Sequence, residues 1–160
     1  MYNKNFNGRG WQKAVLGTVV TVAVGTSGFV YSLRSLNNVK ETQPAMVALT
    51  DCALNKSLVD FVVIDGGRSD EEHANNLKKG VSWIKRSKHQ DGLAVDVAAY
   101  VDGKITYDPH PYSYIAGAFY FCSEKLGIPV TWGGEWKVRD LMHFETVKLE
   151  YIDNRWVRRD

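Results

Sequence analysis

The fold of this chain is decided by the stretch SKHQDGLAVDVAAYV, residues 87–101. This stretch places His89 and Asp96 on either side of a glycine and then continues as an apolar, partly β-branched run. Such a run predicts a strand over residues 94–101, with Asp96 on the strand and His89 in the loop that leads into it. Gly92 would let the chain turn between the two side chains.

A second short motif, DLMHFE at residues 140–145, supplies another histidine from a distant part of the chain. A catalytic zinc ion usually keeps three protein ligands and one open position, and imidazole and carboxylate are among its usual ligands. His89, Asp96 and His143 fill that count, so we predict one zinc ion per chain on these residues. Asp140 remains as a general base for a water whose pKa zinc lowers to about 7.

Two further charged residues are candidates for supporting roles. Glu145 could orient a ligand histidine through its free ring nitrogen, or it could form a salt bridge at a strand end. Arg68 follows two glycines and could bind a substrate carboxylate or stabilise an oxyanion, and a surface arginine on a turn is an equal alternative. His73 and His110 lack a partner at ligand spacing, so we expect neither to bind the metal.

Aromatic and sulfur-containing residues leave alternatives open. Trp132 and Trp136 flank a short glycine-containing segment and could line a substrate groove, although aromatic residues near a strand end more often belong to the core. Cys52 and Cys122 form no CxxC pair, and each lies on the apolar stripe of a predicted helix. We favour two buried thiols, with a disulfide as the alternative if the chain is exported.

The composition predicts a folded protein with one main domain. The chain has 160 residues, of which 44% are hydrophobic and 24% charged, an ordinary mixture for a folded protein. A net charge of +2 is too small to indicate nucleic-acid binding, and no basic stripe with interleaved aromatic residues occurs. We expect a monomer that binds no nucleic acid.

The first 33 residues differ in kind from the rest. Residues 1–13 carry three basic residues and no acidic one, whereas residues 14–33, AVLGTVVTVAVGTSGFVYSL, carry no charge. The length of this run suits a membrane-spanning helix, and the basic flank predicts a cytoplasmic N-terminus and export of the rest of the chain. We therefore divide the chain into a signal or transmembrane segment, residues 1–33, and a catalytic domain, residues 34–160.

This N-terminal segment could take one of several roles. Its glycine and threonine content makes it weakly apolar, so a cleaved signal peptide, a permanent anchor and a signal-arrest-release segment all remain open. We favour arrest in the membrane and subsequent release into the periplasm. A valine-rich strand buried in the core is the alternative without export.

The body of the domain predicts a mixture of helices and mainly antiparallel strands, an α+β fold with a small sheet. The predicted helices begin near Pro44, near Asp70 after a Ser69 capping box, and ahead of a C-terminal Gly127. The predicted strands cover residues 59–64, 94–101, 104–106, 129–132 and 142–145, with a hairpin turn at residues 102–103.

The two motifs together resemble those of the VanY-like zinc peptidases. This group includes D-Ala-D-Ala carboxypeptidases and the L-alanyl-D-glutamate endopeptidases of bacteriophage lysis. The resemblance rests on the pattern Ser87-x-His89-x-x-Gly92-x-Ala94-x-Asp96 followed by Asp140-x-x-His143-x-Glu145, and on the segments YSLRSL (31–36), DFVVIDGGR (60–68) and WGGEW (132–136). It covers approximately residues 31–146.

The resemblance implies a Hedgehog/DD-peptidase α+β fold and a zinc ion on His89, Asp96 and His143. It also implies that Asp140 is the catalytic acid and base, and that Arg68 is the arginine that contacts the substrate or the transition state. Carboxypeptidase relatives usually have glutamate at the position of Asp140, whereas phage endopeptidases often have aspartate. The aspartate therefore favours the endopeptidase branch.

The function implied is a phage endolysin that cleaves peptidoglycan stem peptides between L-Ala and D-Glu and so lyses the host cell. The N-terminal segment would take it to the host inner membrane and the periplasm through the host export machinery. The alternatives are a D-Ala-D-Ala carboxypeptidase of bacterial wall remodelling and a catalytically silent peptidoglycan-binding module.

Overall fold

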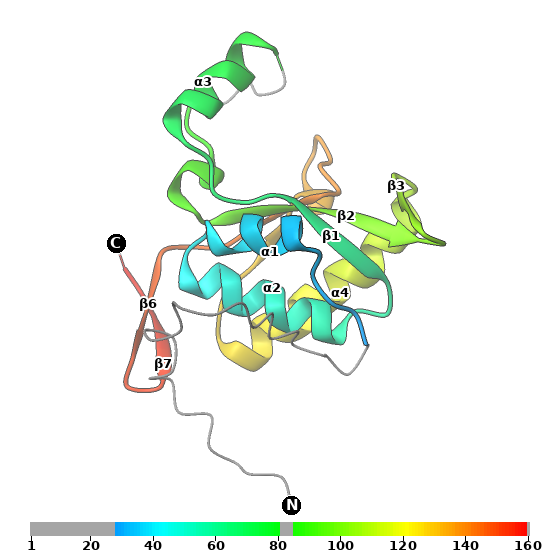
Figure 1. Cartoon of the computed structure of the whole chain (residues 1–160). Coiled ribbons are helices and arrows are strands. Elements are labelled where there is room, and N and C mark those ends of the chain that lie inside the picture. Colours follow the sequence, from blue (N-terminus) through cyan, green and yellow to red (C-terminus); the bar gives the residue numbers. More distant parts are fainter. Residues whose placement is uncertain (1–27, 81–84, 160) are drawn as a thin grey trace, which may run out of the picture.

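The computed structural model describes residues 28–80 and 85–159, and it has the predicted α+β architecture (Figure 1). The helices are α1 (Leu33–Lys40), α2 (Pro44–Lys56), α3 (Asp70–Lys78) and α4 (Pro109–Leu126), with two 3-10 helices, η2 (Lys88–Asp91) and η3 (Gly133–Glu135). The strands are β1 (Asp60–Asp65), β2 (Ala94–Val101), β3 (Lys104–Thr106), β4 (Thr131–Trp132), β5 (His143–Glu145), β6 (Leu149–Ile152) and β7 (Arg155–Arg158).

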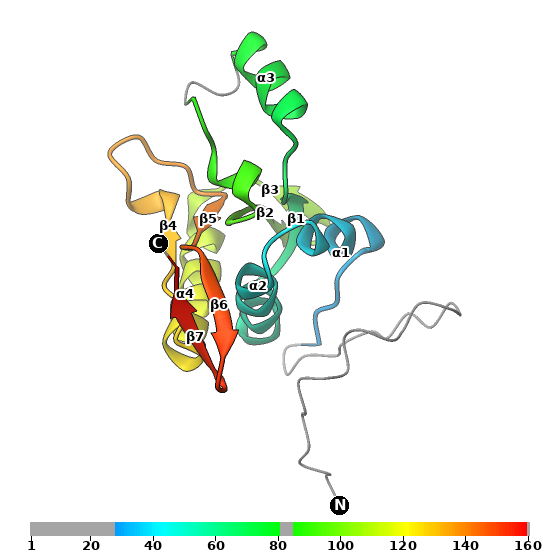
Figure 2. The ribbon, with the colours of Figure 1, turned by 90° about the vertical axis from the view of Figure 1, so that its left-hand side faces the viewer.

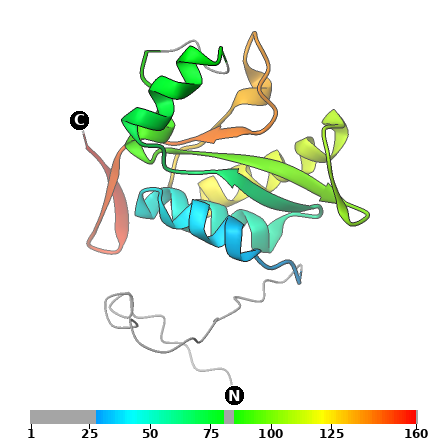
Figure 3. The same cartoon turned by 45° about the horizontal axis from the view of Figure 1, so that its top comes forward.

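The main sheet has the order β1-β2-β5-β4, with β3 paired to β2, and all of these pairings are antiparallel. The β6–β7 hairpin forms a separate two-stranded sheet. Figure 3 shows α2 and α4 beneath the main sheet, with α3 and the loop after β4 above it. An antiparallel sheet commonly has one face packed on the core and the other open, and that arrangement positions the candidate site here.

The alternation of side chains along β2 separates the core from the site. Val95, Val97 and Ala99 point into the hydrophobic core, so Asp96 lies on the opposite face of the sheet. The same alternation on β5 buries Phe144 in the core, where its ring stacks on that of Phe119 of α4 with a centroid separation of 4.0 Å. The residues that flank Phe144 therefore face the same side as Asp96.

The core beneath the sheet holds a disulfide between Cys52 of α2 and Cys122 of α4. The preference for two buried thiols was wrong, because the packing of α2 on α4 brings the two Cα atoms to 5.8 Å, within the range that a disulfide spans. Both cysteines do lie on the core-facing sides of their helices, as predicted. Their pairing depends on a contact between elements 70 residues apart, which the helical pattern of each segment does not contain.

Helix α1 was not predicted, and it covers the free edge of β1. The Ser32 hydroxyl caps the helix by accepting from the Ser35 N–H at 3.1 Å. On the other side, the Ser35 hydroxyl accepts from the Val63 N–H at 3.1 Å, and the Asn38 side-chain amide donates to the Val63 carbonyl at 2.9 Å. These bonds satisfy backbone groups that an edge strand would otherwise expose.

The end of the predicted N-terminal segment belongs to the folded body. Phe29 and Tyr31 pack against the core, and Leu33 begins α1. Residues 1–27, which hold most of the predicted signal or transmembrane segment of residues 1–33, lie outside the described residues. Within residues 28–80 and 85–159, no helix is both long enough and apolar enough to cross a membrane.

Most of the other predicted elements occur near their expected bounds. Ser69 forms a full capping box with Glu72 at the start of α3, and Gly127 ends α4 in the left-handed conformation. The strand expected over residues 129–132 is limited to β4. The β6–β7 hairpin was missed, although its turn residues Asp153 and Asn154 both have positive φ, the conformation that a two-residue hairpin turn requires.

Candidate metal centre

His89 reaches the site from η2, a short helix that its own sequence caps at both ends. The Ser87 hydroxyl accepts from the His89 N–H, and the Gln90 side chain accepts from the Ser87 N–H at 2.9 Å. Gly92 ends η2 with φ of 66°, as its predicted turn role requires. This turn fixes the imidazole of His89 directly before β2, and the side chain is only 3% exposed.

Asp96 and His143 come together because β2 and β5 are neighbouring antiparallel strands. The two residues are direct partners in the ladder, and both lie on the face away from the core. Side chains at directly opposed positions on one face of a sheet lie within contact distance. Two ligands from sequence-distant motifs therefore meet through strand register, and His89 joins them from the loop above.

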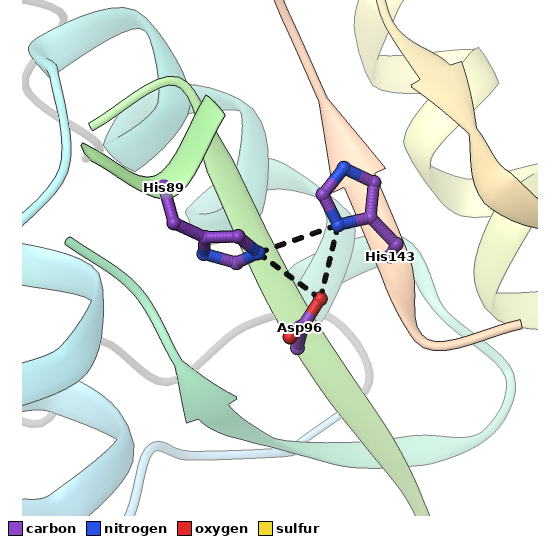
Figure 4. A group of neighbouring side chains, drawn as sticks. All are labelled: His89, Asp96 and His143. Carbon is purple, nitrogen blue, oxygen red and sulfur yellow. Dashed lines mark hydrogen bonds and ion pairs between the residues drawn. The ribbon is translucent and has the colours of Figure 1, made fainter. Parts of the chain in front are cut away.

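Three donor atoms converge at this point, as Figure 4 shows. The Nδ1 atom of His143 lies 3.1 Å from Oδ1 of Asp96 and 3.3 Å from Nε2 of His89, and Nε2 of His89 lies 3.3 Å from the same carboxylate oxygen. Among the described residues, these three side chains form the cluster of potential ligands that could hold a metal ion. The structure thus brings together His89, Asp96 and His143.

The remaining nitrogen of each imidazole has a hydrogen-bond acceptor. Nδ1–H of His89 donates to the Gly66 carbonyl at 2.7 Å, and Nε2 of His143 lies 3.1 Å from Oε2 of Glu145. Because these acceptors bind the N–H groups of the outer nitrogens, the inner nitrogens are the atoms left to bind a metal ion once they are deprotonated. Of the two roles considered for Glu145, orientation of a ligand histidine is the one that fits this geometry.

The charges around the site favour ionised carboxylates. Burial alone would raise the pKa of Asp96, but hydrogen bonds from His143 and His89 outweigh it and hold that pKa well below its usual range. Burial alone would lower the pKa of His143, but Asp96 and Glu145 raise it to about 9. The hydrogen bond from His143 likewise lowers the pKa of Glu145. The site therefore has the negative charge that attracts a cation.

Arg68 lies beside the metal site and is held there at two points. Its backbone N–H donates to the His89 carbonyl at 3.0 Å, and its guanidinium forms an ion pair with Asp65. Asp65 in turn is the ladder partner of Asp96 across β1 and β2. The side chain is only 13% exposed, which a free surface arginine would not be. Sequence reasoning missed Asp65, although an acid directly after an apolar strand and before two glycines was a usable signal.

Asp140 lies in the loop that leads into β5. Its carbonyl accepts from the His143 N–H at 3.4 Å, and its carboxylate accepts from the Met142 N–H at 3.3 Å. The residue is exposed and is not one of the three converging donors. A Cβ on Gly133 would lie 2.5 Å from the Asp140 carbonyl oxygen and 3.2 Å from Cβ of His143, so the absence of a side chain at residue 133 lets this loop approach the metal ligand.

Trp132 and Trp136 have different places in the structure. Trp132 donates from its indole nitrogen to the Leu141 carbonyl at 2.8 Å and stacks on Phe144 in the core. Trp136 is 38% exposed, and its ring centroid lies 5.1 Å from that of His143. Trp136 is therefore the one placed to contact a substrate. Of the other histidines, His73 is buried on α3 and His110 lies in the first turn of α4.

The donor set fits a catalytic metal better than a structural one. Two imidazoles and one carboxylate leave a position open, whereas structural zinc sites are closed by four protein ligands and are rich in cysteine. The outer hydrogen bonds to Gly66 and Glu145 are of the kind that orient metal ligands. The arrangement is compatible with a metal-dependent hydrolase.

Comparison with known proteins places the chain among the peptidases. The family model described as phage L-alanyl-D-glutamate peptidase matches residues 27–157. The chain therefore belongs to the phage L-alanyl-D-glutamate peptidase family, and the resemblance drawn from its motifs is confirmed.

Two relatives show how far the similarity extends. The L-alanyl-D-glutamate peptidase of Escherichia phage T5 is 29% identical over 127 residues, which cover 77% of this chain and 93% of that protein. The crystal structure of the Serratia marcescens L-Ala D-Glu endopeptidase ChiX matches with a TM-score of 0.68 and 36% identity. That match covers 73% of this chain and 89% of ChiX, so it spans most of the described body.

Proposed function

We propose that this chain is an endopeptidase that cleaves the bond between L-Ala and D-Glu in peptidoglycan stem peptides and thereby lyses a phage-infected cell. The observation that carries the proposal is the convergence of His89, Asp96 and His143, oriented by outer hydrogen bonds, in a member of this peptidase family. The activities named for both relatives agree with the endopeptidase branch over the carboxypeptidase alternative.

We propose zinc as the metal, held by Nε2 of His89, Oδ1 of Asp96 and Nδ1 of His143. Nitrogen and carboxylate donors in this number are typical of catalytic zinc sites. When bound, zinc would supply the Lewis acidity that polarises the scissile carbonyl and makes water a better nucleophile. The orientation of both imidazoles prepares the donors before the metal arrives.

The remaining chemistry falls to Asp140 and Arg68. The Asp140 carboxylate takes a proton from the attacking water and then delivers it to the amine nitrogen of D-glutamate as the peptide C–N bond breaks. The Arg68 guanidinium, steadied by Asp65, binds the substrate or the negative charge that develops on the carbonyl oxygen. Trp136 beside His143 limits access of bulk water to the same place.

We also propose export, with residues 1–33 as a signal-arrest-release segment that acts first in the host inner membrane and then in the periplasm. The basic flank and the long uncharged run support this. The Cys52–Cys122 disulfide agrees with it, because disulfides persist in the periplasm and are rare in the cytosol. A monomer remains our expectation.

The experiment is a digestion of purified peptidoglycan by the zinc-loaded full chain, with mass spectrometry of the fragments. Stem peptides that begin with D-Glu are expected. Asp140→Asn should reduce kcat by about 100-fold or more while zinc binding is retained, since removal of a general base typically costs about 10²–10⁴-fold. The asparagine can still accept from the Met142 N–H, so the loop should keep its conformation.

A matched control is Glu124→Gln, which makes the same change of charge on the exposed surface of α4 and should retain full activity. Release of free D-Ala in place of stem peptides would identify the carboxypeptidase alternative. Full hydrolysis by Asp140→Asn would refute the general-base role.

A further inference from the structure

A basic pocket lies next to the candidate metal centre, and the chemistry proposed above makes no use of it. Its cavity has a volume of about 590 Å³. The charged residues that line it are Lys88, Lys148, Arg158, Arg159 and Asp91. We refer to these five residues as the basic pocket. Four cationic side chains against one carboxylate make this cavity a place for an anion.

The single acid in the pocket is already neutralised. The Asp91 carboxylate forms an ion pair with Arg86, which does not line the cavity. On the other side, Arg159 is paired with Glu150 at 2.5 Å. Among the described residues, no ion pair joins Lys88, Lys148 or Arg158 to a carboxylate. Three cationic side chains are therefore available to a ligand.

The pocket is built on the same elements as the metal site. Lys88 directly precedes the metal ligand His89 on η2, and Lys148 lies three residues after Glu145. The Thr146 N–H donates to the Leu93 carbonyl at 2.8 Å, which ties the segment after β5 to the end of η2. Figure 2 shows η2 between α3 above and the β6–β7 hairpin below. The pocket therefore adjoins the metal site on the side formed by η2 and the segment after β5.

The hairpin holds the other cations in a defined position. Arg158 is the ladder partner of Leu149 on β6, and the Arg159 N–H donates to the Lys148 carbonyl at 3.0 Å. Lys148 and Arg158 therefore lie on neighbouring, hydrogen-bonded segments. Such preorganisation lowers the entropy cost of binding a ligand between them. This gives the β6–β7 hairpin a role beyond its packing on the core through Leu149 and Trp156.

We propose that the basic pocket binds the carboxylates on the D-glutamate side of the stem peptide, so that it selects substrates by charge. This inference rests on the proposed function, which places an L-Ala–D-Glu bond at the metal site. D-Glutamate has two carboxyl groups and needs only one for its link to the next residue, so one carboxylate remains near the cut. The C-terminus of the stem peptide supplies another. Lysine and arginine side chains bind such groups through charge-assisted hydrogen bonds.

The test measures binding of the peptide product that begins with D-Glu, and of the same peptide with its carboxylates converted to amides. Isothermal titration calorimetry with the zinc-loaded full chain should show about tenfold tighter binding of the acidic peptide. The double variant Lys148→Gln/Arg158→Gln should reduce this preference to about twofold or less. Both side chains are exposed, so the variant should fold normally. Arg155→Gln, on the same hairpin outside the pocket, should keep the tenfold preference.

Kinetics give a second readout, in which the double variant should raise KM about tenfold and change kcat by less than twofold. An unchanged preference for the acidic peptide in the double variant would overturn the proposal. Binding of vesicles containing phosphatidylglycerol, or of inorganic phosphate, in place of the acidic peptide would also overturn it. A wild-type protein that cuts another bond but still prefers the acidic peptide through Lys148 and Arg158 would refute the proposed function and leave the anion pocket standing.

Discussion

Reduction of the Cys52–Cys122 disulfide should destabilise the domain strongly without altering its chemistry. The bond joins α2 to α4 across the core, whereas the candidate metal centre lies on the other face of the sheet. A reduced but folded molecule should therefore keep the geometry of His89, Asp96 and His143. Activity per folded molecule should remain within about twofold of the oxidised protein.

The loss of stability on reduction depends on the length of chain that the disulfide closes into a loop. The two cysteines are 70 residues apart, and the loop-entropy relation for such a closure gives about 4 kcal/mol of stabilisation. Small domains are stable by about 5–15 kcal/mol in total, so this is a large share. For a chain of this size the loss corresponds to a fall in Tm of roughly 10–15 °C.

The assay is urea denaturation of the zinc-loaded protein, monitored by circular dichroism with and without a reductant that does not bind zinc. The double variant Cys52→Ala/Cys122→Ala is the matched control, because its stability should not respond to the reductant. A difference of less than about 1 kcal/mol between oxidised and reduced wild type would refute the reasoning. Detection of two free thiols in protein purified under oxidising conditions would refute the disulfide itself.

Two further predictions concern how the site holds its metal. Glu145→Gln should weaken zinc binding by about 10- to 100-fold, because the amide is a poorer acceptor for the His143 imidazole. Competition with a chromophoric chelator measures the zinc affinity, and Glu124→Gln is the control. Equal affinities would show that Glu145 plays no part in metal binding. The raised pKa of His143, about 9 against an ordinary 6.5, means that zinc must displace a proton at neutral pH. The apparent affinity for zinc should therefore rise about tenfold per pH unit from pH 7 towards 9. In the metal-free protein, the charged imidazole should stabilise the fold fully below pH 6.5, and this stabilisation should be lost as the pH rises to about 9. A pH-independent affinity would contradict this assignment.

The candidate site was largely predictable because its information is local. His89, Gly92 and Asp96 lie within one short stretch, and alternation along β2 determines which face Asp96 takes. The prediction that His143 joins them required only that a later strand pair with β2, which β5 does. Strand periodicity and ligand chemistry together were sufficient for these residues.

The features that were missed depend on contacts between distant segments. The Cys52–Cys122 bond requires the packing of α2 on α4, and the pairing of Asp65 with Asp96 requires β1 to lie beside β2. Helix α1 begins inside the uncharged run that suggested a membrane segment, so its role at the edge of β1 was hidden by composition. Such contacts leave no periodic trace in the sequence.

The basic pocket illustrates the same limit. Lys88 belongs to the metal-binding stretch, whereas Lys148 and Arg158 lie on either side of a hairpin that was not predicted. Lys88, Lys148 and Arg158 lie far apart in the sequence, and a net charge of +2 gives no indication that they gather in one place. Only the fold gathers them beside the site.

The most direct test of a zinc centre on His89, Asp96 and His143 is a titration of metal-stripped protein with zinc, monitored by native mass spectrometry and by peptidoglycan hydrolysis. We expect one zinc ion per chain, hydrolysis that appears in proportion to its uptake, and no uptake by His89→Ala or His143→Ala. Full hydrolysis by the metal-free protein would contradict the account.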